Sequence, residues 1–128
     1  MINFEIAEHT DQCIDELEIE DDVKMRDYIV VNHSALELPK MLYANELISN
    51  ESITIQFDYW IGNSKCTHLK QFVHPPYTRR HLARIICSEL KHIYGIHCPG
   101  WSIVSEMHLK GVELKNNIYV VEYYTVVI

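Results

Sequence analysis

The chain has 128 residues, a formal net charge of −7 and an apolar content of 48%. This length fits one domain with one hydrophobic core, and the apolar share excludes a chain that is disordered throughout. A membrane-spanning helix is also excluded, because the longest apolar run, from Ile118, is interrupted by Glu122 and is about half of the roughly 20 residues required.

The negative charge is concentrated at the start of the chain. Residues 1–30 contain ten acids and two bases, whereas the other residues contain eight acids and nine bases. Such an acidic N-terminal segment repels the phosphates of nucleic acids and attracts basic proteins. We therefore expect the partner to be another protein, of basic character, and we do not expect direct binding of nucleic acid.

The compartment is predicted from the first residues and the cysteines. The chain begins MINFEIAEHTDQC, with neither a basic nor an apolar stretch, so we expect no secretory signal. The four cysteines have no CxxC spacing, which in a chain without an export signal indicates reduced thiols in the cytoplasm. They are Cys13, Cys66, Cys87 and Cys98.

The first 50 residues predict short elements. Ile2 to Ile6 alternates between apolar and polar residues, which predicts a short strand. The acidic segment at 7–24 has only a weak helical stripe and can be loosely ordered. Residues 28–31, Tyr-Ile-Val-Val, predict a buried strand, and Pro39 permits the first turn of a helix that ends near Asn50.

The middle of the chain predicts a hairpin. Apolar and polar residues alternate strictly from Ile53 to Ile61, which indicates a strand with one buried face. Gly62 to Ser64 predicts a turn, and Cys66 to Val73 returns as the partner strand.

Residues 79–94 have the clearest helical pattern. Two prolines precede the segment, Thr78 can cap its first turn, and Gly95 suits its end. Its apolar residues recur at three- and four-residue spacing and form one stripe: Leu82, Ile85, Ile86, Leu90 and Ile93. We expect this helix to cover a sheet.

The end of the chain predicts a second hairpin. Trp101 to Leu109 alternates, and the apolar phase changes after Gly111, which indicates a β-bulge. Asn116 and Asn117 tolerate the positive φ of a tight turn. Ile118 to Ile128 is apolar on both faces, as expected for a strand that is central in a sheet or covered in an oligomer.

Together these elements predict a single α+β domain over residues 1–128. Its sheet is expected to be antiparallel and built from two hairpins, with two helices packed on one face.

The tripeptide His-Leu-Lys occurs once in each predicted hairpin. On a strand the His and Lys of each copy share a face. Two histidines can act as base and acid on a phosphodiester while lysine stabilises the charge on phosphate. One alternative function is therefore a metal-independent phosphodiesterase or ribonuclease that uses His68, Lys70, His108 and Lys110.

No metal or cofactor is predicted. Histidines and cysteines occur at 66–74 and 92–98, but without the CxxC or HxxxH pairs typical of zinc sites. The four glycines are scattered, so no phosphate-binding loop is expected.

The main hypothesis is a small acidic cytoplasmic protein of the inhibitor or immunity type. It would neutralise a basic partner such as a nuclease toxin or a nucleic-acid-handling defence protein, with its carboxylates in place of phosphates. The predicted contact residues are Asp15, Glu16, Glu18, Glu20, Asp21 and Asp22. A further alternative is an oligomeric structural protein assembled through the C-terminal strand.

Overall fold

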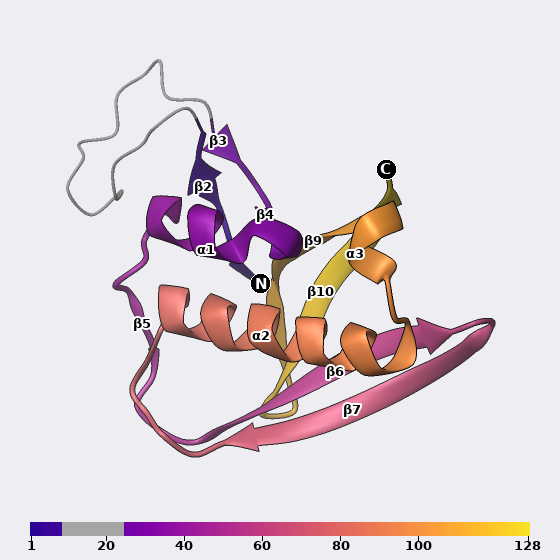
Figure 1. Ribbon diagram of the computed structural model, residues 1–128. Coiled ribbons are helices and arrows are strands. Elements are labelled where there is room, and N and C mark those ends of the chain that lie inside the picture. Colours follow the sequence, from indigo (N-terminus) through magenta and orange to yellow (C-terminus); the bar gives the residue numbers. More distant parts are fainter. Residues whose placement is uncertain (9–24) are drawn as a thin grey trace.

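The computed structural model describes residues 1–8 and 25–128 (Figure 1). The six predicted contact residues, and all but the first two residues of the acidic segment at 7–24, lie outside the described residues. The described chain is a mixture of strands and a few helices, which confirms the α+β prediction.

The main sheet has six strands in the order β1-β9-β10-β6-β7, with β4 also paired to β9. The hairpins β6–β7 and β9–β10 are antiparallel, but β6 and β10 run parallel where they meet. The sheet is therefore mixed and larger than the antiparallel pair of hairpins that was expected. Its strands are β1 (Ile2–Asn3), β4 (Ile29–Val30), β6 (Ile53–Ile61), β7 (Ser64–Phe72), β9 (Ser105–Lys115) and β10 (Ile118–Val127).

The other elements are short, apart from one long helix, α2. No helix in the described ranges has both the length and the apolar content to cross a bilayer. The two smaller sheets pair β2 (Ile6–Ala7) with β3 (Met25–Arg26) and β5 (Leu47–Ser49) with β8 (Tyr77–Thr78). The helical elements are η2 (Val31–His33), α1 (Ser34–Glu37), η3 (Leu38–Lys40), α2 (Arg79–His97) and α3 (Trp101–Val104).

Helix α2 begins and packs as its sequence predicts. The Thr78 side chain accepts a hydrogen bond from the backbone N–H of His81, which caps the first turn. The buried stripe of α2 packs in one core with the inner face of the sheet. Its members from the helix include Leu82, Ile86, Leu90 and Ile93, and those from the sheet include Ile53, Ile55, Phe57, Met107, Leu109 and Val112.

The helix predicted from Pro39 to about Asn50 does not form. The 3₁₀ turn η3 ends at Lys40, and the chain then passes through Tyr43 with a φ of 53° and into β5. The backbone here bonds to distant segments instead of to itself: Leu42 N donates to Glu5 O at 2.8 Å, and Ala44 O accepts from Arg80 N at 3.0 Å. These long-range bonds replace the helical ones, so a second covering helix is not found at this place.

The phase change at Gly111 is a β-bulge, as predicted. Glu122 of β10 pairs with Gly111 and Tyr123 pairs with Leu109, so Lys110 is the extra residue. A Cβ on Gly111 would lie 2.1 Å from the Ile2 carbonyl oxygen, because β1 approaches closely here. The turn between β9 and β10 has φ values of 51° and 64° at Asn116 and Asn117, as expected.

One segment of the second hairpin differs from its prediction. Residues 101–104 form the short helix α3 instead of the start of a strand. Gly100 has a φ of 81°, and Trp101 N donates to Cys98 O at 3.0 Å, so the turn after α2 continues into a further helical turn.

Candidate functional site

The first His-Leu-Lys copy, in β7, points toward α2. His68 pairs across the hairpin with Phe57, a core residue, so both side chains lie on the helix side of the sheet. Lys70 Nζ donates to Glu89 Oε2 at 2.8 Å, and His68 Nε2 lies 3.2 Å from Glu89 Oε1 without hydrogen-bond geometry. Glu89 belongs to α2 and is buried. This copy therefore compensates the charge of a buried carboxylate.

The second copy, in β9, points the other way. His108 lies between the core residues Met107 and Leu109, so its side chain is on the face of the sheet opposite α2. Its ring stacks on Tyr28 with centroids 4.2 Å apart, and Nε2 lies 3.2 Å from Glu106 Oε1.

The two copies are therefore not brought together, and the predicted catalytic constellation is not assembled. His68 and Lys70 face α2, whereas His108 lies across the sheet, and Lys110 is the bulge residue with Nζ 3.8 Å from Asp27. A single phosphate cannot contact both histidines through the sheet. This geometry gives the phosphodiesterase alternative no support, because the two copies turn opposite faces of their strands toward α2.

The candidate metal ligands are also separated. Within residues 1–8 and 25–128, no group of three or more His, Cys, Asp or Glu side chains could hold a metal ion. His97 stacks on Tyr59 with centroids 5.2 Å apart. Cys66, Cys87 and Cys98 are free thiols, and burial raises the pKa of Cys87 to about 12, which makes this core thiol unreactive.

The most distinctive feature is the place where the two hairpins separate. β6 and β10 pair only through Thr54–Gln56 and Ile118–Val120. Beyond that point β6 continues with β7 to Ile61, and β10 continues with β9 to Val127. Figure 1 shows the two hairpins diverging, with α3 and the end of α2 nearby.

The separation leaves one edge of β10 open. Ile128 N donates to Val104 O at 2.9 Å, which places the backbone groups of the even-numbered residues at the end of β10 toward β9. Because these groups alternate along a strand, the N–H and C=O of Tyr123, Thr125 and Val127 point to the other side. No strand among the described residues pairs with them there.

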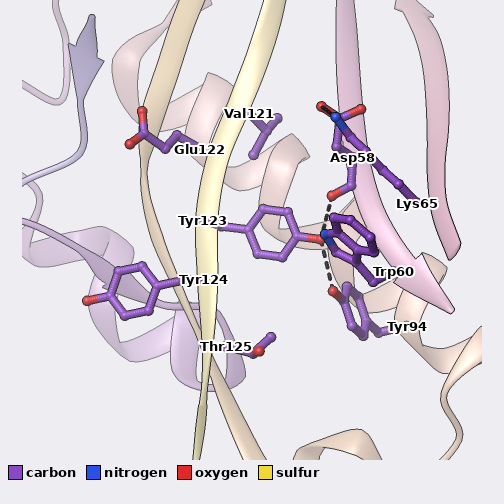
Figure 2. A pocket seen from close by; sticks show the side chains of 9 residues that line it. All are labelled: Asp58, Trp60, Lys65, Tyr94, Val121, Glu122, Tyr123, Tyr124 and Thr125. Atoms are coloured by element: carbon purple, nitrogen blue, oxygen red, sulfur yellow. Dashed lines mark hydrogen bonds and ion pairs between the residues drawn. The ribbon is translucent and has the colours of Figure 1, made fainter. Parts of the chain in front are cut away.

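A pair of tyrosines spans the gap between β10 and β6. The Tyr123 hydroxyl donates to the backbone oxygen of Asp58 at 2.7 Å and lies 2.9 Å from the Tyr94 hydroxyl (Figure 2). Burial raises the pKa of both phenols above the ordinary tyrosine value, so they remain neutral at physiological pH. This bridge holds the hairpins together just beyond their last strand pairing.

Two neighbouring hollows follow the open edge. One, of about 500 Å³, lies between β10 and β6, and the other, of about 520 Å³, lies against α3 and the end of α2. They share Trp60, Tyr94 and Thr125. We call this region the β6–β10 groove, defined by Trp60, Tyr94, Trp101, Val104, Tyr123 and Thr125.

Sequence reasoning missed this groove. The available signals were the tryptophan on the polar face of the strand at 53–61 and the tyrosines of the last strand. No family model, no curated protein and no solved structure matches the chain. The groove offers aromatic surface and backbone hydrogen-bonding groups, a combination that suits binding of a polypeptide.

Proposed function

We propose that the protein is a binding domain of the inhibitor or immunity type, which neutralises a basic partner protein. The observation that carries this proposal is the distribution of charge. Residues 9–24 contain seven acids and one base, whereas all the other residues contain eleven acids and ten bases. Nearly the whole net charge therefore belongs to one short stretch of the chain.

The contacts of the described basic residues support this proposal. Lys70 pairs with Glu89, Arg79 Nη2 lies 3.0 Å from Glu46 Oε2, and Lys91 donates to the Ser34 hydroxyl at 2.7 Å. These bases serve internal contacts, so a basic surface for nucleic acid has less support than an acidic one for protein.

The proposed contact uses carboxylates in place of nucleic-acid phosphates. A row of acids accelerates association with a basic cleft and makes the association rate depend on salt. The residues assigned to this contact are Asp15, Glu16, Glu18, Glu20, Asp21 and Asp22. The proposed place of action is the cytoplasm, which agrees with free thiols at Cys66, Cys87 and Cys98.

The experiment is a pull-down with matched charge reversals. The full chain is immobilised and exposed to an extract of its own cells, and bound proteins are identified by mass spectrometry. One variant carries Asp15→Lys, Glu18→Lys and Asp22→Lys. The control carries Asp27→Lys, Glu51→Lys and Glu113→Lys, which change the net charge equally at exposed sites of the described part.

We expect one stoichiometric basic partner that binds the wild type and the control and is lost with the first variant. Equal loss in both variants would show that only the overall charge matters. Retention by both variants, or a complex whose association rate does not change with salt, would contradict the proposal.

A further inference from the structure

We propose that the β6–β10 groove binds an extended segment of a partner protein, which adds as a strand to the open edge of β10. The segment would alternate between apolar and basic side chains. This inference rests on the proposed function only in taking the ligand to be a protein, and the residues that carry it are other than 9–24.

The backbone of β10 supplies the first argument. Tyr123, Thr125 and Val127 direct their N–H and C=O groups toward the groove, where no described strand pairs with them. An extended segment satisfies such groups with a ladder of main-chain hydrogen bonds. The adjoining edge of β6 is engaged at Asp58 O by the Tyr123 hydroxyl, so β10 is the edge that remains available.

The side chains around the edge supply the second argument. Figure 2 shows Tyr123 and Thr125 projecting from β10 toward β6, and Glu122 and Tyr124 projecting to the opposite side. Trp60 and Val104 line the hollows and are 56% and 61% exposed. Residues of the added strand on this side therefore meet apolar surface, which favours aliphatic or aromatic side chains.

The opposite side of the added strand meets negative charge. Glu122 is exposed and has no ion-pair partner in the described part of the chain, and Glu106 lies on the same face of the neighbouring strand. A lysine or arginine of the bound segment on this side gains a charge partner. The pattern of the ligand follows, with basic and apolar residues in alternation.

The groove also favours a single segment over a second copy of this chain. A second copy would bring its own β9–β10 hairpin beside β6, where Trp60 and α3 already border hollows of about 500 Å³. Two copies also each carry a net charge of −7. A single basic strand faces neither obstacle.

The test is selection from a phage-displayed library of random dodecapeptides on the full-length protein. Selected peptides are then synthesised and titrated against two variants of one residue. Thr125→Pro removes an N–H of the open edge and puts a ring in the way of the added strand, whereas Thr125→Val keeps the N–H and the size. Circular dichroism and thermal unfolding check that both variants fold.

We expect peptides with alternating basic and apolar residues whose affinity falls at least about tenfold with Thr125→Pro and changes much less with Thr125→Val, which keeps the backbone N–H. The Asp15→Lys, Glu18→Lys, Asp22→Lys variant should bind the same peptides, so failure of the acidic contact and failure of this groove are distinguishable. If Thr125→Pro does not fold, N-methylation of alternate peptide amides replaces it: one alternate set should abolish binding and the other should not.

Three results would overturn the proposal. They are a library that yields no binding peptide, peptides that are insensitive to both Thr125→Pro and N-methylation, and a wild-type dimer in sedimentation whose interface is the β10 edge. The last result would instead support the oligomeric alternative for the C-terminal strand.

Discussion

The hairpins β6–β7 and β9–β10 carry the same tripeptide in opposite orientations. In β7 the histidine and lysine face α2 and the leucine is 54% exposed, whereas in β9 the leucine is fully buried and the histidine lies on the outer face. The difference shows that three residues do not determine which side chains enter the core. The phase of the strand relative to the covering helix determines it.

The two hairpins also differ in the pairing of the strand edges that face each other. β6 and β10 share only three paired residues each, and beyond these no strand within residues 1–8 and 25–128 pairs with the second edge of β10. The separation of the hairpins creates the groove, whereas the two histidines are kept apart by the opposite phases of β7 and β9 relative to α2. The predicted catalytic side chains are therefore not assembled, and the groove is the site that we propose for binding.

The contrast between the two leucines predicts the largest effect. Leu109→Ala should lower the free energy of unfolding by about 3 kcal/mol, because it leaves a cavity in the core. Leu69→Ala removes an exposed side chain and should cost less than about 0.5 kcal/mol. Urea denaturation measures both, and equal losses would mean that the tripeptides share an orientation.

The bulge that sets the phase of β9 predicts the next effect. Gly111→Ala places a methyl group against the Ile2 carbonyl and should cost about 2 kcal/mol, since β1 must move away. Gly95→Ala is the control, because a Cβ there meets open space inside α2 and should stabilise by about 0.5 to 1 kcal/mol. Thermal unfolding compares the two, and a neutral Gly111→Ala would contradict the close approach of β1.

The two lysines predict a smaller contrast. Lys70→Met removes a hydrogen bond to the buried Glu89 carboxylate and should cost about 1.5 kcal/mol, a value reduced by the half-exposed position of the lysine. Lys110→Met loses only a 3.8 Å contact with exposed Asp27 and should change stability by less than about 0.5 kcal/mol. The same urea denaturation measures both variants. A larger loss of stability for Lys110→Met than for Lys70→Met would contradict the assignment of Lys70 as the partner of the buried Glu89.

The tyrosine bridge predicts a further effect of about 1 kcal/mol. Tyr123→Phe leaves Asp58 O without its donor, whereas Tyr124→Phe alters only a 3.3 Å contact with His108 and serves as the control. A larger loss of unfolding free energy for Tyr124→Phe than for Tyr123→Phe in the same assay would show that the bridge does not hold the hairpins together.

The bridge also predicts a dependence of stability on alkaline pH. The pKa values of Tyr94 and Tyr123 are raised by burial, so above the ordinary tyrosine value of about 10 the unfolded chain releases protons that the folded chain retains. Stability contributed by the neutral phenols is therefore present below pH 10 and decreases as pH rises further. Between pH 9 and 11 the melting temperature should fall less steeply for Tyr123→Phe than for the wild type. An equal fall in both proteins would contradict the bridge.

Much of the local structure could be predicted from the sequence, because the signals were local. The alternation from Ile53 to Ile61 matches the bounds of β6, and the cap at Thr78 matches the start of α2. The bulge at Lys110 and the turn at Asn116 and Asn117 were likewise visible as a phase change and a residue pair.

The rest depends on contacts between distant segments. The helix expected after Pro39 is replaced by bonds from residues 42–46 to Glu5, Arg79 and Arg80. The parallel junction of β6 with β10 joins strands more than 50 residues apart, and strand order cannot be read from alternation. The candidate site could not be predicted for the same reason, since the groove exists only because of that junction.

The open edge of β10 is tested most directly by amide hydrogen exchange, followed by NMR on the full chain. We predict slow exchange at Tyr124, Val126 and Ile128, whose N–H groups face β9, and fast exchange at Tyr123, Thr125 and Val127. Equal protection of both sets would show that another strand already covers the edge, and it would contradict the groove as a binding site.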